Sequence, residues 1–264
     1  MKIISIVSFL LFFSWSHSLF SFYVGNPSNP AITNSGLFSH GYLLKGSTGY
    51  LYDYTTVKQY HAPQTEKNFN PNATFKEFGI HSQMASFSLI LIERLEIFGY
   101  AGGSKEQTQG KTHPSILFDF ESQYQFSWAA GSKVVLLQWG GTSLGCDFTY
   151  FAVPSSPKSF FQYFNRVGLP IDFGKQKISL EEWQINAGLT TRISLFAPYI
   201  GGTYLHSNLH VASSPETGSI NYENEKKWGY FFGLTVSLTG KFHINLERRQ
   251  KNESAYSLAT IAVF

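Results

Sequence analysis

The sequence has few charged residues and almost no cysteine. Charged side chains make up 14% of the 264 residues, and Cys146 is the single cysteine. One cysteine cannot form an intramolecular disulfide, so the disulfide-stapled secreted domains are excluded. The 20 Lys and Arg face 17 Asp and Glu without a long basic run, which predicts no nucleic-acid partner. Disorder is excluded because aromatic residues reach 17% of the chain.

Long apolar runs are missing too, except near the N-terminus. Lys2 precedes an apolar stretch over residues 3–15, which is shorter than the about 20 residues of a membrane-spanning helix. A positive end, an apolar centre and small residues at the following positions are typical of a secretory signal peptide. We therefore predict a signal peptide over 1–18, cleaved after Ser18 or Ser21, and a mature domain over 19–264. An uncleaved buried helix is the alternative.

The rest of the chain alternates apolar and polar residues with a period of two, as β-strands with two unlike faces do. The polar positions are mainly Ser, Thr, Asn, Gln, Gly and His. The apolar sets are Phe87, Leu89 and Leu91; Tyr124, Phe126 and Trp128; Leu144, Cys146, Phe148 and Tyr150; Trp183, Ile185, Ala187 and Leu189; Tyr230, Phe232, Leu234, Val236 and Leu238; and Phe242, Ile244 and Leu246.

Two architectures produce such alternation: a soluble β-sandwich with apolar residues inside, and a transmembrane barrel with apolar residues facing lipid. The low charge favours the barrel, because soluble surfaces carry more charge. Aromatic residues at segment ends resemble the girdles of membrane barrels. These are Tyr50, Tyr52, Tyr54, Trp139, Tyr150, Phe151, Trp228 and Tyr230. The sequence therefore predicts an all-β fold, a transmembrane antiparallel β-barrel.

The length predicts about 12 strands, with a range of 10 to 14, at roughly 20 residues per strand and connection. Turns are expected at Glu93-Arg94, Gly131-Ser132 and Thr239-Gly240. The expected strands are 37–45, 48–57, 74–91, 94–104, 115–129, 133–153, 160–167, 178–192, 194–208, 229–238, 241–249 and 254–264. The last strand ends in an aromatic residue, so Tyr256, Leu258 and Phe264 are interpreted as a C-terminal assembly signal of an outer-membrane protein.

The polar faces of these strands are the candidate site, because they point into the lumen of a barrel. We expect Asp147, Arg192, His243, Asn245 and Glu247 to line a pore, where charges select ions. The alternative is a packed polar interior without a channel, since small barrels fill themselves. Arg248 and Arg249 are expected at the membrane interface. Residues 25–30 are expected to form a turn-rich periplasmic tether.

Enzymatic and metal chemistry have only weak signals. Gly141-Thr142-Ser143-Leu144-Gly145 matches a nucleophile elbow, but a strand follows it where that motif needs a helix. His206 and His210 lie about 13 Å apart on a strand, too far to share one ion unless the chain folds back. We therefore predict no enzyme, no metal site and no cofactor.

Several short sequence motifs occur in order along the chain. They are Val24-Gly25-Asn26-Pro27, Phe126-Ser127-Trp128-Ala129-Ala130-Gly131, Leu144-Gly145-Cys146-Asp147-Phe148, Glu182-Trp183-Gln184, Pro198-Tyr199-Ile200-Gly201 and Asn245-Leu246-Glu247-Arg248-Arg249. Together they resemble the chlamydial major outer membrane protein family of porins, over about 24–264. That family is longer and cysteine-rich, so this chain resembles a shorter, cysteine-poor relative.

The resemblance implies an outer-membrane porin that contacts lipid, passes small hydrophilic solutes and ions by passive diffusion, and forms a homotrimer. It also implies a structural role in the envelope. The alternative is a non-conducting structural barrel or an adhesin that acts through surface loops, expected at 58–73, 104–114 and 207–227.

Overall fold

A computed structural model describes residues 22–32, 44–61, 74–113, 116–155, 159–164, 167–171, 177–212, 219–239 and 241–264. The predicted signal peptide lies outside the described residues, as do most of the expected strand 37–45 and residues 62–73 of the first expected loop.

The described residues form one 15-stranded antiparallel sheet and a single short helix, α2 (Asn29–Ile32). The strands are β1 (Leu44–Val57), β2 (Tyr60–His61), β3 (Thr74–Leu91), β4 (Leu95–His113), β5 (Ile116–Glu121), β6 (Gln125–Trp139), β7 (Thr142–Ser155), β8 (Ser159–Phe164), β9 (Val167–Ile171), β10 (Lys177–Thr191), β11 (Phe196–Ala212), β12 (Ser219–Asn224), β13 (Trp228–Ser237), β14 (Phe242–Gln250) and β15 (Ser254–Val263). In the described part of the chain, no helix is long and apolar enough to span a membrane.

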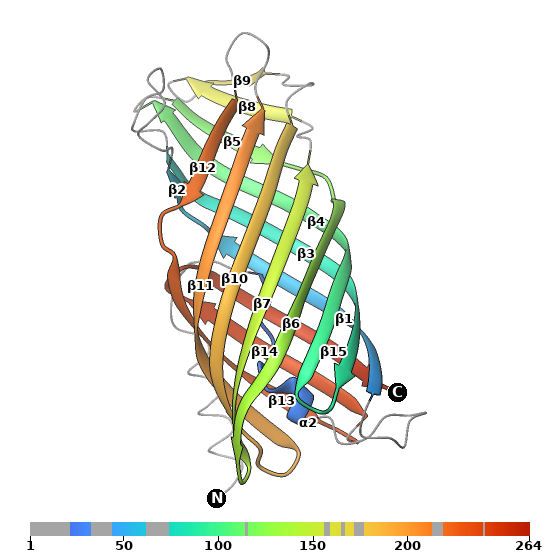
Figure 1. Cartoon of the computed structure of the whole chain (residues 1–264). Coiled ribbons are helices and arrows are strands. Elements are labelled where there is room, and N and C mark those ends of the chain that lie inside the picture. Colours follow the sequence, from blue (N-terminus) through green and yellow to red (C-terminus); the bar gives the residue numbers. More distant parts are fainter. Residues whose placement is uncertain are drawn as a thin grey trace, which may run out of the picture.

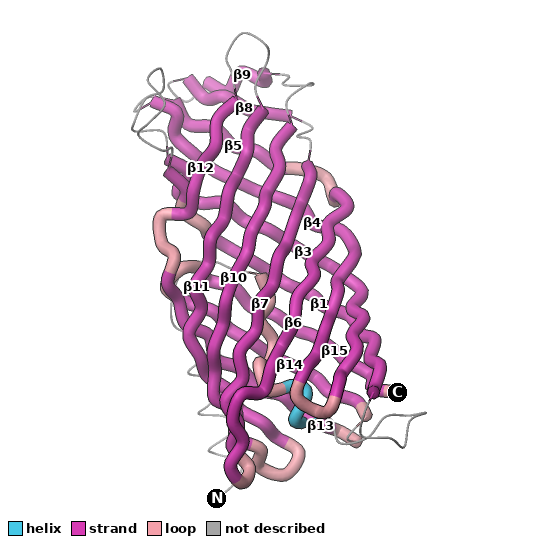
Figure 2. Tube along the Cα trace, in the orientation of Figure 1, coloured by secondary structure: helices cyan, strands magenta, loops and turns pink. Residues whose placement is uncertain are grey.

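The sheet closes into a barrel (Figures 1 and 2). Ten of the described strands form the ring β3-β1-β15-β14-β13-β11-β10-β7-β6-β4, which closes through the pairing of β3 with β4. β12 and β2 pair with each other and bridge β11 to β3 beyond the end of β13, so they complete the wall. β5, β8 and β9 extend it from β4. The predicted fold class is confirmed, and the ten ring strands together with β2 and β12 make the twelve strands that the sequence predicts.

The connections at one end of the barrel are short. The predicted turn at Glu93-Arg94 is confirmed between β3 and β4. The turn expected at Gly131-Ser132 is wrong, because both residues lie inside β6, opposite Thr149 and Phe148 of β7. The chain turns instead at Gly140, where a positive φ of 57° suits glycine. The expected loops 104–114 and 207–227 are largely strand, in β4, β11 and β12.

An aromatic belt runs along the outer face of the barrel, near the middle of the strands, over β1, β6, β7, β10, β11, β13 and β15. Trp128 lies 5.5 Å from Tyr150, and Tyr204 lies 5.5 Å from Trp183 and 4.9 Å from Trp228, between ring centroids. Tyr52, Tyr54, Tyr230 and Tyr256 continue the belt across β1, β13 and β15. Of the predicted girdle residues, Phe151 is wrong, because it is buried inside the barrel, and Trp139 lies at the turn end.

Between the aromatic belt and the short turns, the outer face is apolar. Its exposed side chains include Phe87, Leu89, Ile97, Phe148, Ile185, Leu189, Ile200 and Leu246. The apolar sets predicted from the alternation therefore point outward. Trp128 and Trp139 mark the two ends of this apolar face on β6. Because the strands of membrane barrels are tilted, the distance between these residues, projected on the barrel axis, is roughly the 25 Å height of the apolar band of such barrels.

Beyond the belt, toward the end of the barrel with the long connections, the polar residues face outward and the apolar residues face inward. On β10, Ser179 and Glu181 face outward while Ile178 and Leu180 are buried inside. On β11, His210 faces outward and Leu209 is buried. This part of the barrel has a polar outside and an apolar inside, as expected for a wall that leaves the lipid and enters water.

Candidate functional site: the filled interior of the barrel

The membrane-embedded part of the lumen holds the N-terminal segment 22–32, here called the plug. Phe22, Tyr23, Val24, Asn26, Ser28 and Asn29 are all at most 3% exposed. Its helix α2 contacts β4 and β6 near the turn end of the barrel (Figure 2). The expectation of a periplasmic tether over 25–30 is wrong, because the wall of the barrel encloses these residues.

The plug is shaped by its own turn-forming residues. Gly25 adopts a positive φ of 69°, which glycine tolerates without strain. The Asn26 side chain accepts a hydrogen bond from the Ser28 amide at 2.9 Å, and the Asn26 carbonyl accepts one from the Asn29 amide at 3.0 Å. Such side-chain bonds to the next amides are a common reason for asparagine in turns.

Hydrogen bonds tie the plug to six of the ten ring strands, namely β4, β6, β7, β10, β13 and β14. The Val24 amide donates to Glu247 at 3.0 Å, and Lys133 donates to the Val24 carbonyl at 2.8 Å. Gln184 and Asn245 donate to the Phe22 carbonyl and the Tyr23 hydroxyl at 3.0 and 2.9 Å. Each such bond contributes about 1 kcal/mol, so the sum is substantial although each contact is weak.

A glycine of the wall permits the plug to approach closely. A Cβ atom at Gly145 of β7 would lie 2.6 Å from the Pro27 carbonyl carbon and would clash with the Pro27 oxygen. A Cβ at Gly188 of β10 would lie 3.3 Å from Pro27 Cγ. The inner face of β7 and β10 is therefore shaped to the plug backbone.

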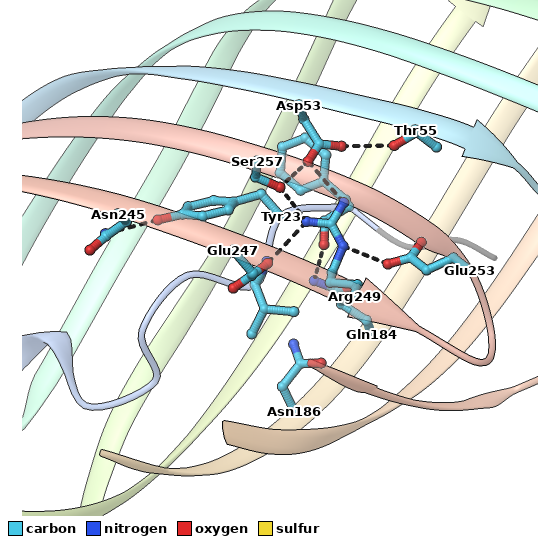
Figure 3. Close-up of polar contacts among 12 residues, drawn as sticks. Tyr23, Asp53, Thr55, Gln184, Asn186, Asn245, Glu247, Arg249, Glu253 and Ser257 are labelled. Carbon is cyan, nitrogen blue, oxygen red and sulfur yellow. Dashed lines mark hydrogen bonds and ion pairs between the residues drawn. The ribbon is translucent and has the colours of Figure 1, made fainter. Parts of the chain in front are cut away.

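An arginine surrounded by three carboxylates lies next to the plug (Figure 3). Arg249 is fully buried and bonds Asp53 at 2.8 Å, Glu247 at 3.0 Å and Glu253 at 2.5 Å. Ser257 accepts from Arg249 at 2.6 Å and donates to Asp53. The expectation that Arg249 lies at the membrane interface is wrong, because it shares the inward parity of Glu247.

A second buried network lies just beyond the C-terminal end of β1. Lys58 forms an ion pair with Glu182 and donates to the Ser207 hydroxyl at 2.7 Å. Ser207 also bonds Glu182 and Tyr60, at 2.7 and 2.8 Å. Burial lowers the pKa of Lys58, against the opposite effect of the Glu253 charge. A small cavity lies between Lys58, Glu182, Asp53 and Phe22.

An apolar layer crosses the interior next to this cavity. It joins buried residues from both the wall and the plug. Phe22 stacks on Phe151 with ring centroids 4.5 Å apart, and Tyr23 and Phe22 make edge contacts with Tyr100. Leu51, Phe78, Met84 and Leu180 belong to the same cluster. Apart from the hydroxyl groups of Tyr23, Tyr60, Tyr100 and Tyr222, this layer offers water and ions no polar partner, which makes their entry unfavourable.

The structure places four of the five predicted pore-lining residues inside the barrel. Asp147, His243, Asn245 and Glu247 are all buried and inward-facing. Arg192 is misplaced by the prediction: β10 ends at Thr191, and Arg192 is exposed in the turn to β11. The role of the other four in a pore stays a prediction.

The residues interpreted as an assembly signal face outward. Tyr256, Leu258 and Phe264 are each about two-fifths exposed on the lipid-facing side. The Phe264 amide donates to the Gly46 carbonyl at 2.9 Å, so the last residue is held against the start of β1. Their role in assembly stays a prediction.

The weak chemical motifs lie in ordinary strand positions. Ser143 is buried on β7, and the strand continues after it without a helix. His206 and His210 both lie on the outer face of β11, and His206 contacts the Trp183 ring. No cluster of three metal-ligating side chains occurs within the ranges that the structure describes.

Two features of the barrel interior were missed from the sequence. The first is the plug, which offers only a turn signal, because its partners lie up to 223 residues away. The second is the set around Arg249, including Asp53 and Glu253. Arg249 could have been found, since it continues the inward series of His243, Asn245 and Glu247.

Sequence comparison finds porins of chlamydiae. The chain is 26% identical over 151 residues to the major outer membrane porin of Chlamydia psittaci, covering 46% of this chain and 36% of the relative. It is 29% identical over 108 residues to that of Chlamydophila psittaci (strain ATCC VR-125 / 6BC), covering 31% and 27%. The matched regions thus span about a third of the length of these relatives. No protein-family model matches the chain.

Solved barrels are similar at low identity. The outer membrane protease OmpT from Escherichia coli has 13% identity, covers 83% of this chain and 94% of its own, and gives a TM-score of 0.43. The translocator domain of autotransporter NalP from Neisseria meningitidis has 10% identity, covers 86% and 90%, and gives 0.43. At these scores the likenesses carry no functional argument.

The chain is an outer-membrane β-barrel with a sequence relationship to the chlamydial major outer membrane porins. Its own geometry agrees with this placement, since an aromatic belt and an apolar outer face surround a polar interior. In such barrels the short turns face the periplasm.

Proposed function

We propose that the protein is a porin-type channel for small hydrophilic solutes and ions, and that the plug closes it in the described conformation. One observation carries the proposal. Between the aromatic belt and the short turns, here called the membrane band, the inner face of the wall is polar. The space that it encloses is filled by a separate segment, the plug, which individual hydrogen bonds hold in place. Removing that segment leaves a lumen lined by Asp147, Asn245 and Glu247. The sequence relationship to proteins named porins supports the same function.

A permanently sealed structural barrel is the second candidate. It is favoured by the apolar layer, to which the wall contributes Leu51, Phe78, Met84 and Leu180 as well as Phe151. A layer that stays closed without the plug blocks ions by dewetting. Such a barrel would support the envelope or present its long connections to partners. Neither candidate assigns catalysis, a cofactor or a metal, and trimer formation remains part of the porin proposal.

Single-channel recording separates the two candidates. The full chain and a variant lacking residues 22–32 are purified in detergent and inserted into planar bilayers. The porin proposal expects small or rare conductance steps from the full chain and larger, sustained steps from the variant. If both proteins show the heat-modifiable gel shift of a folded barrel and neither conducts, the channel proposal is overturned in favour of the sealed structural barrel.

A further inference from the structure

The buried charges inside the barrel are unequal in sign. Among the residues that the structure describes, seven inward-facing carboxylates stand against four inward-facing cations; Arg248 is also buried, but it has the outward parity of β14 and lies over the Tyr256 ring. The carboxylates are Asp53, Glu96, Glu106, Asp147, Glu182, Glu247 and Glu253, and the cations are Lys45, Lys58, Lys133 and Arg249. The whole chain carries a formal charge of +3. The acidic excess therefore belongs to the interior and is not a property of the composition.

The interior cations are already engaged by protein groups. Arg249 bonds three carboxylates, and Lys58 pairs with Glu182. Lys133 donates to the Val24 and Asn26 carbonyls of the plug at 2.8 and 3.4 Å, and Lys45 bonds Glu93 at the turn end at 2.9 Å. An anion entering the barrel would have to compete with the bonds of Arg249, Lys58 and Lys45, whereas Lys133 loses its two carbonyl partners when the plug is absent.

Buried oxygen acceptors give a second, independent observation. Six carboxylate or amide oxygens are buried without a hydrogen-bond donor among the described residues. They are Asp147 Oδ2, Gln184 Oε1, Asn186 Oδ1, Asn245 Oδ1, Asn252 Oδ1 and Glu253 Oε2. They extend from the middle of the membrane band, at Asp147 and Asn186, to the level of the belt, at Glu253. Oxygen atoms of this kind replace the hydration shell of a cation.

We propose that the interior selects cations over anions, and that Asp147 and Glu253 are selectivity-determining residues at two depths of the lumen. The permeant class is small cations, including alkali ions and small organic ammonium ions, which can donate hydrogen bonds to the same oxygens. This inference rests on the proposed channel function. Lys133 opposes the preference, because it lies directly opposite Asp147 in the pairing of β6 with β7.

Zero-current potentials under a KCl gradient test the inference, with the chain lacking residues 22–32 as the conducting background. K⁺ should be preferred over Cl⁻. Asp147→Asn should reduce the permeability ratio by at least about fivefold, because one unit charge about 4 Å from K⁺ in water contributes about 1 kcal/mol and the lost repulsion of Cl⁻ acts in the same direction. Glu253→Gln should reduce it in the same direction, and Lys133→Gln should raise it. Glu181→Gln is the matched control, because Glu181 faces outward beside the inward Glu182.

The outcomes are distinguishable. A folded protein that never conducts overturns the channel function, and this inference fails with it. A conducting protein that prefers Cl⁻, or whose ratio is unchanged by Asp147→Asn and Glu253→Gln, overturns the inference alone. The heat-modifiable gel shift establishes that each variant is folded before it is recorded.

Discussion

Arg249 bonds three carboxylates that would otherwise be buried without a counter-charge. Removing one partner of a buried ion pair is far more costly than removing an exposed charge, since the remaining charges lose both water and partner. The three carboxylates come from β1, from β14 and from the turn between β14 and β15. The guanidinium therefore joins neighbouring strands from the inside, in addition to their backbone pairing.

We predict that Arg249→Met lowers the free energy of unfolding by about 3–5 kcal/mol, because Asp53, Glu247 and Glu253 lose their shared cation. Urea unfolding in detergent micelles, followed by the heat-modifiable gel shift, measures the change. Arg192→Met is the control: Arg192 is exposed in a turn, so its replacement should alter stability by less than about 0.5 kcal/mol. Equal effects of the two substitutions would contradict the assignment.

Strand parity determined how well single residues could be predicted. Asp147, His243, Asn245 and Glu247 sit within long alternating runs, so their inward direction followed from the sequence. Arg192 follows the last residue of β10, where a shift of one position removes a side chain from the strand. The role of Arg249 depends on Asp53, which lies 196 residues away and has no local signal.

The turn between β3 and β4 holds two residues in the left-handed region. Ile92 and Glu93 both have φ of 55°, which is unusual for a β-branched residue. Asparagine tolerates this region better, so Ile92→Asn should stabilise the hairpin by about 1 kcal/mol. The same urea titration measures it. Ile193→Asn is the control, because Ile193 is exposed in a turn without a positive φ, and this substitution should not raise the free energy of unfolding. A lower free energy of unfolding for Ile92→Asn would contradict the prediction.

The plug depends on the absence of a side chain at Gly145. We predict that Gly145→Leu displaces the plug, because the new side chain would occupy the space of the Pro27 carbonyl. The variant should conduct more than the full chain in planar bilayers. Gly99→Leu is the matched control on β4, where a Cβ meets its nearest atom at 3.7 Å on the outer face. Equal conductance in both variants would mean that the plug does not limit the current.

Most strands were predictable as elements and the plug was not. The expected strands 115–129 and 133–153 were wrong, because β6 (Gln125–Trp139) spans the gap between them and the chain turns at Gly140. A strand can be identified from the sequence by the alternation of apolar and polar residues over ten or more positions, as in β10 and β13. Residues 25–30 showed only turn chemistry, which is the same for an exposed tether and for a segment buried in a lumen. The long strand β4 was also underestimated, since Gly102 and Gly103 interrupt its apolar pattern without ending its pairing.

At the scale of the whole molecule, the described barrel has two zones of opposite polarity that meet at the aromatic belt. Below the belt the apolar residues face outward, and above it they face inward. An arginine introduced on the outer face should therefore have unequal costs at two heights of one strand. Ile200→Arg, in the apolar band of β11, should destabilise the barrel by about 2–4 kcal/mol in lipid vesicles.

His210→Arg on the same face of β11 is the matched comparison, because this position lies beyond the belt in the polar part. It should change stability by about 0–1 kcal/mol. Folding into vesicles at graded urea concentrations measures both values. Similar losses at both positions would place the membrane higher on the barrel than the belt indicates.

The position of the plug has a consequence for the order of folding. Its hydrogen bonds to Glu247 and Thr235 join residues separated by 223 and 209 positions in the chain. The segment is synthesised before nearly all of the wall, yet its docking surface exists only after β13 and β14 have paired. Contacts of such high sequence separation are slow to form, because the entropy of closing a long loop opposes them. We therefore expect an interval in which the cylinder is closed but unfilled, and under the proposed channel function the length of that interval sets how long a newly inserted copy leaks.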